Sequence, residues 1–501
     1  MKNQLKAGVI LSYVISVMQI VIQLLYTPLI LRVLGQSEYG LYTLIGSIVS
    51  YLSLCGLGFS SSYLRFYSRC IGENRKNEVA KLNGMYLTVY IIIASVSTIL
   101  GTVLVLNCEK VVGTKILPSE MDTARILMAI LVVNIAITFV NTIFDSIIIA
   151  NESFIFQRVV RLLSIVANPI LALPLLLMGF KSLALVVVTT VLSLGSLIIN
   201  MFYCRKKIHA EFKFGYFDKA LFGEILTFSV FIFINLIVDQ INWNLDKLLL
   251  GHFWGTAAVA VYGVGSQLNN MDISISLSVS SVFGPRVNRY HAIGKADEEF
   301  SELFIKTGRI QCLIMMLLNS GLVFFGEQFI SLWAGDGYKE SYYVMLCLVL
   351  PAFIPCIQNI GLEMQRAKNM HQFRSIIYLL MSVINIIISI PLAKMYGAVG
   401  AAIGTTIGML LGNGICMNWF YYKKMKLDIV RFWKNILKMF PPMIIPFAVG
   451  VFVNLAFKIT TWYELIILCV FYTLVYVVAV WFGSMNEYEK SIIKSFIKPI
   501  S

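Results

Sequence analysis

A polar cluster interrupts one of the most apolar stretches of the chain, where residues 236–251 read LIVDQINWNLDKLLLG. Four polar residues in this region lie four, three and four positions apart and so share one face of a helix: Asn235, Asp239, Asn242 and Asp246. Carboxylates in such a place can take up a proton or a cation, and carboxamides can hydrogen-bond to hydroxyl groups. The spacing therefore indicates a face that binds a ligand or carries an ion.

Two other carboxylates are expected inside helices. Asp272 shares one face of its helix with Asn269, Ser276 and Ser280. Asp145 lies in another helix, together with Asn134 and Asn141. A charged carboxylate facing lipid at mid-span costs about 2.5–3.5 kcal/mol, so Asp239 and Asp272 are expected to face the protein interior or water. We predict ion-coupling roles for Asp239, Asp272, Asp145 and Asp246. For any single amide, an interhelical hydrogen bond worth about 0.6 kcal/mol is the alternative.

Cations occur at corresponding places in the two halves of the chain. Arg32 lies three residues before Gly35, and Lys247 lies four residues before Gly251. Both cations suit the binding of a phosphate group. Extension of the side chain to the membrane interface, called snorkelling, explains their positions equally well. A local pair between Asp246 and Lys247 is also open. Three arginines at expected helix ends, Arg65, Arg286 and Arg309, fit the anchoring role of cytoplasmic cations.

The composition requires that membrane helices position these residues. Of the 501 residues, 58% are hydrophobic and 13% charged, and the mean hydropathy is +0.81, which leaves too little polar surface for a soluble domain. About fourteen apolar runs can cross roughly 30 Å of hydrocarbon, from residues 7–34 to residues 462–483. The first is too long for a signal-peptide core and is expected to be a retained span. The sequence therefore predicts an all-α polytopic membrane protein with fourteen transmembrane helices.

The distribution of Lys and Arg predicts the orientation. About 31 of the 40 cations fall on the termini and on alternate connections, and about 9 fall on the others. The positive-inside rule then places both termini in the cytoplasm, and it accounts for the net charge of +14 without nucleic acid. The longest connections run to only about twenty residues, too few for a catalytic domain.

An internal repeat appears at a separation of about 217 residues. Asn168, Pro174 and Thr189 recur as Asn385, Pro391 and Thr405, and Leu34-Gly35 recurs as Leu250-Gly251. An even number of helices per copy gives both copies the same orientation, as in transporters with parallel repeats. We predict two pseudo-symmetric six-helix lobes around a central cavity, residues 1–210 and 211–425, with two further helices and a cytoplasmic tail in residues 426–501. The repeat places Gln19 and Gln23 at the positions of Asn235 and Asp239, so it pairs two polar faces.

The cysteines and histidines predict no metal site, disulfide framework or cofactor. The nine Cys are scattered without a Cys-x-x-Cys pair, and the four His lie far apart in the sequence.

Two segments resemble a known family. LRVLGQSEYGLYTL (residues 31–44) and GLGFSSSYLRFYSR (residues 56–69) resemble the polysaccharide transporters of the multidrug/oligosaccharidyl-lipid/polysaccharide (MOP) exporter superfamily, and most closely the O-antigen, capsule and exopolysaccharide flippases. The resemblance implies a V-shaped cavity between two lobes, alternating access, coupling to a proton or sodium gradient, and a bacterial cytoplasmic membrane. It also implies that cavity cations hold a pyrophosphate. We carry that role to Arg32 and Lys247, and secondarily to Arg65 and Arg286.

These observations lead to the hypothesis of a flippase, not an enzyme, for an undecaprenyl-pyrophosphate-linked oligosaccharide. Sugar hydroxyls are expected to contact Gln19, Gln23, Asn235 and Asn242. The expected partners are the lipid-linked oligosaccharide, membrane lipids, a proton or sodium ion, and polysaccharide polymerase and glycosyltransferases. A multidrug exporter or a lipid II flippase is the alternative within the superfamily. A membrane-embedded glycan polymerase or acyltransferase is the alternative outside it, against which the short loops and dispersed histidines argue.

Overall fold

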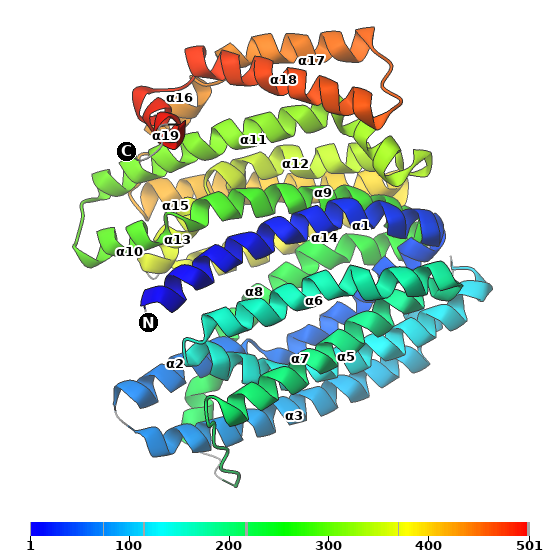
Figure 1. Ribbon diagram of the computed structural model, residues 1–501, viewed down its shortest axis with the longest axis vertical. Helices are drawn as coiled ribbons and strands as arrows, with labels where there is room; N and C mark the ends of the chain where they lie inside the picture. Colours follow the sequence, from blue (N-terminus) through cyan, green and yellow to red (C-terminus); the bar gives the residue numbers. More distant parts are fainter. Residues whose placement is uncertain (1, 74, 114–115, 216–218, 369, 498–501) are drawn as a thin grey trace. The chain divides into compact units, whose positions relative to one another are not determined.

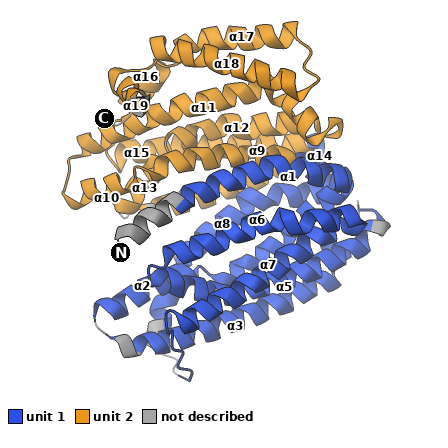
Figure 2. Cartoon of the chain, in the orientation of Figure 1, with its two compact units in different colours: residues 1–263, 393–397 blue, residues 264–392, 398–501 orange. Residues whose placement is uncertain are grey.

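The computed structural model describes residues 2–73, 75–113, 116–215, 219–368 and 370–497, which fold into helices with no β-strand among them (Figure 1). The predicted all-α fold is confirmed. The chain forms two compact units (Figure 2): unit 1 comprises residues 1–263 and 393–397, and unit 2 comprises residues 264–392 and 398–501. The lobes with boundaries near residues 210 and 425 were predicted from the internal repeat, and they describe its two copies, whereas the units describe compactness. These lobe boundaries stay a prediction.

Unit 1 contains eight complete helices among its described residues: α1 (Lys2–Ser50), α2 (Phe59–Gly72), α3 (Lys76–Leu106), α4 (Cys108–Val112), α5 (Pro118–Ala150), α6 (Phe154–Leu175), α7 (Lys181–Lys206) and α8 (Lys219–Trp254). A 3₁₀ segment (Tyr51–Gly56) follows α1, and a π-helical segment (Leu176–Phe180) joins α6 to α7. Helix α5 packs against α3 and α7, and α1 packs against α5, α6 and α8. The first part of α9 (Thr256–Ser281) completes the unit.

Unit 2 contains the rest of α9, most of α14 (His371–Met409), and α10 (Gly284–Ala292), α11 (Asp297–Ala334), α12 (Ser341–Ile357), α13 (Ile360–Ala367), α15 (Asn418–Lys423), α16 (Ile429–Leu437), α17 (Ile444–Ala456), α18 (Trp462–Gly483) and α19 (Glu487–Ile497). Shorter segments are the 3₁₀ turns Asp336–Tyr338 and Pro441–Met443 and the π-helical Leu410–Met417. Helix α11 is central, because α12, α16, α17 and α18 all pack against it (Figure 1).

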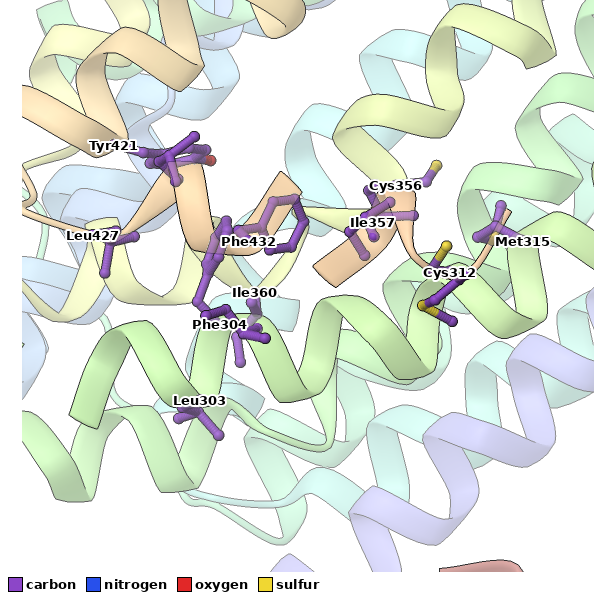
Figure 3. Close-up of a cluster of buried hydrophobic side chains, with 14 of the residues drawn as sticks. Leu303, Phe304, Cys312, Met315, Cys356, Ile357, Ile360, Tyr421, Leu427 and Phe432 are labelled. Atoms are coloured by element: carbon purple, nitrogen blue, oxygen red, sulfur yellow. The ribbon is translucent and has the colours of Figure 1, made fainter. Parts of the chain in front are cut away.

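The core of unit 2 includes a cluster of buried side chains from α11, α12, α13 and the C-terminal helices (Figure 3). Phe304 of α11 packs against Phe432 of α16, with 4.8 Å between ring centroids. A Cβ on Gly308 would lie 2.4 Å from Phe432 Cε2, so glycine at this position lets α16 approach α11. The C-terminal helices are thus part of this core.

Nine helices or continuous helical runs among the described residues are long and apolar enough to cross a membrane. Three of them exceed 50 residues, and each contains a glycine whose backbone is not helical: Gly35, Gly179 and Gly397. At Gly35, for example, φ is +73° and ψ is 175°, which breaks α1 into two helices. One run in this count can therefore hold two helices, and the number fourteen stays a prediction.

The repeat found in the sequence has matching hydrogen bonds. Asn168 donates to Thr189 at 3.2 Å in unit 1, and Asn385 donates to Thr405 at 3.5 Å in unit 2. A second repeated hydrogen bond was not predicted from the sequence. Asn200 donates to Asn141 at 3.0 Å, and Gln358 donates to Asn418 at 2.9 Å. Each bond recurs about 217 residues later, as a duplicated bundle predicts.

The signature LRVLGQSEYGLYTL forms a tight junction after the break at Gly35, which we call the Gly40 junction. The Ser37 hydroxyl donates to Glu120 at 2.5 Å and lies 2.8 Å from the Thr256 hydroxyl. On the next residue, Glu38 accepts a hydrogen bond from Ser182 of α7. A Cβ on Gly40 would lie 1.8 Å from the carbonyl oxygen of Thr256. Two side chains and one glycine of α1 thereby join it to α5, α7 and α9.

We expect Gly40→Ala to reduce the yield of folded protein strongly, because its methyl group would collide with backbone that cannot rotate away. Gly46→Ala is the matched control on the same helix, since a Cβ there meets no atom within 4 Å. That change should be neutral or stabilise the helix by up to about 1 kcal/mol. Size-exclusion chromatography of both variants in detergent measures the difference, and equal yields would contradict the tight junction.

Candidate functional site

The predicted polar face lies on helix α8, and we call it the polar stripe: Asn235, Asp239, Asn242 and Asp246. These four side chains differ in how exposed they are. Asp239 is exposed, Asn235 and Asn242 are half-buried, and Asp246 is buried at 3% exposure. Between them, Gln240 ties α8 to the end of α1: its Oε1 accepts from Ser50 at 3.0 Å, and its Nε2 donates to Ser53 at 3.0 Å. The stripe is therefore presented by a helix whose other side is fixed to α1.

The buried end of the stripe is held by a tyrosine. The Tyr262 hydroxyl of α9 donates to Asp246 Oδ2 at 2.5 Å, and the adjacent Lys247 is half-buried. A carboxylate that accepts a short hydrogen bond from a buried hydroxyl is fixed in position. Tyr262 therefore holds the Asp246 carboxyl group in position on α8, next in the sequence to Lys247.

The other residues predicted to bind substrate lie at accessible positions. On α1, Gln19 and Arg32 are exposed and Gln23 is half-buried, and Arg65 is exposed on α2. Arg286 is exposed on α10, where its guanidinium donates to the Tyr290 hydroxyl at 3.0 and 3.2 Å. These side chains therefore lie wholly or partly at the surface of their own unit.

Asp272 of α9 lies in a buried polar network inside unit 2. Its side chain is 3% exposed, and the Asn319 carboxamide of α11 lies against it; with its nitrogen turned toward the carboxylate, the amide donates to Oδ1 at 3.0 Å. One turn further, Ser276 accepts from Gln311 at 3.4 Å and from Asn359 at 2.7 Å, and donates to the Cys356 carbonyl at 2.7 Å. This network places a carboxyl group among amides and hydroxyls.

The polar residues of α5 lie in seams between helices. Asn134 donates to Ser193 at 3.0 Å, Asn141 accepts from Asn200, and both Asp145 oxygens accept from Gln157 at 3.0 Å. The interhelical hydrogen bond, stated above as the alternative for a single amide, describes these two asparagines.

The sequence did not predict the most deeply buried ion pair among the described residues. Arg309, placed above at a helix end as an anchor, donates to Glu489 of α19 at 2.6 and 3.0 Å and to the Ser484 carbonyl at 2.8 Å. The two side chains are 9% and 2% exposed. The partners are 180 residues apart, and no spacing rule connects them.

Comparisons with known proteins identify the family. A family model described as polysaccharide biosynthesis protein matches residues 29–343, which is more than half of the chain. The chain belongs to this family. A relative from Shigella flexneri, whose name describes an O-antigen transporter, is 19% identical over 400 residues, covering 78% of this chain and 91% of its own length. The predicted resemblance to the polysaccharide branch is confirmed.

Solved structures show which fold this family member adopts. A lipid II flippase, MurJ, in an inward closed conformation has a TM-score of 0.72 and 17% identity, covering 98% of this chain and 99% of its own. An inward-facing multidrug resistance MATE transporter of the MOP superfamily has a TM-score of 0.65 and 14% identity, covering 84% of this chain and 99% of its own. The chain therefore has the MOP transporter fold over nearly its whole length, and it is a multi-pass membrane protein. The names of two relatives, an O-antigen transporter and a flippase, agree with the prediction that the chain is not an enzyme.

Proposed function

We propose that the chain is a flippase that moves an undecaprenyl-pyrophosphate-linked oligosaccharide across the bacterial cytoplasmic membrane by ion-coupled alternating access. The observation that carries this proposal is the lipid II flippase fold, which spans 98% of the chain. Membership of the polysaccharide biosynthesis family and the Shigella relative direct the substrate toward a lipid-linked glycan. Both termini lie in the cytoplasm in this proposal, as the distribution of cations predicts.

The accessible cations hold the pyrophosphate in the proposed mechanism. Arg32 and Lys247 bind its oxygens, and Arg65 and Arg286 attract the anion near the helix ends. Arginine pairs with phosphate oxygens through two parallel hydrogen bonds, which suits a diphosphate. Sugar hydroxyls contact Gln19, Gln23, Asn235 and Asn242.

Among the four predicted carboxylates, Asp272 is assigned the main coupling role. It is almost completely buried, so its charge state depends strongly on its surroundings and can bias two conformations. Asp239 is the second candidate, because its exposed position on α8 gives a cation direct access. Asp145 and Asp246, which accept hydrogen bonds from Gln157 and Tyr262, are the remaining candidates.

Reconstitution tests the cation assignment. In liposomes loaded with undecaprenyl-pyrophosphate-linked oligosaccharide, the double variant Arg32→Ala with Lys247→Ala should flip substrate at least about a hundredfold more slowly, since each charged hydrogen bond contributes about 1.5–3 kcal/mol. The matched control is Lys110→Ala, an exposed cation at the end of α4. Wild-type flipping by the double variant would remove these residues from the site.

The same liposomes separate the alternative substrates. The fold of MurJ and of the MATE transporter gives a specific reason to test lipid II and cationic dyes. We expect the lipid-linked oligosaccharide of a polysaccharide pathway to be moved faster than either. Preferential movement of lipid II or of a dye would overturn the substrate assignment while leaving a transporter.

A further inference from the structure

A row of buried polar side chains runs between α9 and α11 of unit 2. On α9, Asn269, Asp272, Ser276 and Ser280 lie three, four and four residues apart, and all are at most 3% exposed. On α11, Thr307, Gln311 and Asn319 are at most 5% exposed. The contacts Gln311–Ser276 and Asn319–Asp272 join the two sets. From Asp272 the row runs through Ser276 and Ser280 toward the end of unit 2 where α10 begins, which is the cytoplasmic end in the proposed orientation, and Asn269 lies on the other side of Asp272.

Three oxygen atoms in this row lack a hydrogen-bond partner among the described residues: Asn269 Oδ1, Thr307 Oγ1 and Gln311 Oε1. Their side chains are 1%, 0% and 1% exposed. A buried polar atom left in this way costs about 1–3 kcal/mol, so native proteins satisfy such atoms with water or an ion. Three of them along one helix pair point to a small, polar occupant.

The spacing distinguishes a row of waters from a metal ion. Asn269 and Ser276 are seven residues apart, or about 10 Å along the helix. A cation such as Ca²⁺ gathers its oxygens within about 2.3–2.6 Å, so one ion cannot satisfy atoms spread over that length. A buried water makes about three hydrogen bonds, and successive waters can follow the row.

We propose that this row is a water-filled path that carries protons between the end of unit 2 near Thr307 and Ser280 and the carboxyl group of Asp272. The proposal rests on the proposed transport function and names its coupling ion as the proton. A proton arriving along the waters adds to Asp272 Oδ2 and converts the carboxylate to a carboxylic acid. The same proton returns to the waters when the acid dissociates.

The surroundings of Asp272 suit both states. A carboxamide donates through its nitrogen to a carboxylate and accepts through its oxygen from a carboxylic acid, so Asn319 can turn to serve either form. A titratable group near Asp272 is the thiol of Cys356 on α12, whose backbone carbonyl accepts a hydrogen bond from Ser276. The charged groups of α11 nearest to Asn319 are Glu327, eight residues after it or about 12 Å along the helix, and Arg309, ten residues before it or about 15 Å, which pairs with Glu489. No ion pair between described residues includes Asp272, so the neutral acid is the form that avoids an uncompensated buried charge.

Infrared difference spectroscopy of the purified full-length protein tests the path without substrate. Stepping the pH should produce a carboxylic-acid band that Asp272→Asn removes. In heavy water, that band should exchange about tenfold more slowly in Gln311→Leu, because one relay group is lost. Thr307→Val is a second variant that removes only a hydroxyl, and Ser274→Ala is the control, since Ser274 is exposed on α9 and bonds to its own helix.

Each result of this experiment either supports or overturns the proposed path to Asp272. Slower exchange in either path variant, with the control unchanged, supports the path. Exchange at the wild-type rate in both variants overturns it. A wild-type band that responds to sodium chloride but not to pH overturns the proton assignment in favour of sodium. Absence of glycan flipping in liposomes, with the spectroscopic result unchanged, would overturn the proposed function and leave the path.

Discussion

Replacing Arg309 by methionine should destabilise the protein by about 3–5 kcal/mol, because it leaves the Glu489 carboxylate buried without its counter-charge. The loss extends beyond the ion pair. The guanidinium also donates to the carbonyls of Ser484 and Asn435, which lie after α18 and in α16. One side chain of α11 thus connects three C-terminal helices, and all three contacts are lost together.

Thermal unfolding in detergent measures this effect. Lys306→Met is the matched control, since Lys306 lies on the same helix with an exposed partner, Glu302, at 3.3 Å. An exposed pair of this kind contributes about 0.3–0.5 kcal/mol. The double variant Arg309→Met with Glu489→Met should recover part of the loss, because apolar side chains pack without a desolvation cost. A melting temperature for Arg309→Met equal to that of Lys306→Met would show that the pair does not stabilise unit 2.

Asp272→Asn should abolish export with little change in the amount of folded protein. The substitution keeps the size and planarity of the side chain and its hydrogen bonding to Asn319, but it removes the ionisation. A coupling group biases the two conformations by about 1.4 kcal/mol, or about tenfold, for each pKa unit by which the conformations differ. Surface glycan should therefore fall by at least about tenfold.

Cells in which this chain is the sole flippase allow the measurement. Surface glycan is quantified by antibody binding, and protein amount by immunoblot of the membrane fraction. Ser274→Ala is again the control, because that side chain is exposed on the same helix. Full export by Asp272→Asn would exclude Asp272 from coupling and leave Asp239 as the group to test.

The sequence predicted those features that depend on helix periodicity. It placed Asp272 on a common face with Asn269, Ser276 and Ser280, and the structure buries that face against α11. It also identified Asn168 and Thr189 as repeated, and each copy makes the same bond. Helix periodicity predicts which residues share a helix face. The internal repeat predicts which residue of the second copy corresponds to a given residue of the first.

Periodicity does not determine which neighbour covers a face. The sequence grouped Asn134 and Asn141 with Asp145 in one helix, but it gave no sign that α7 covers the two asparagines through Ser193 and Asn200. Thr307 and Gln311 lie four residues apart on α11, but no carboxylate marks their face in the sequence, and only the contact of Gln311 with Ser276 of α9 gives that face significance. The partner of Arg309 is 180 residues away, beyond any local rule.

The distance along the chain between Arg309 and Glu489 also has a consequence for synthesis. At about 5–20 residues per second, a ribosome needs about 9–36 s to make the 180 residues between them. During that interval Arg309 has entered the membrane segment of α11 before its acidic partner exists. Unit 2 therefore completes its packing only after α19 has emerged from the ribosome. A chain that stops before Glu489 leaves the Arg309 guanidinium buried in α11 without its counter-charge.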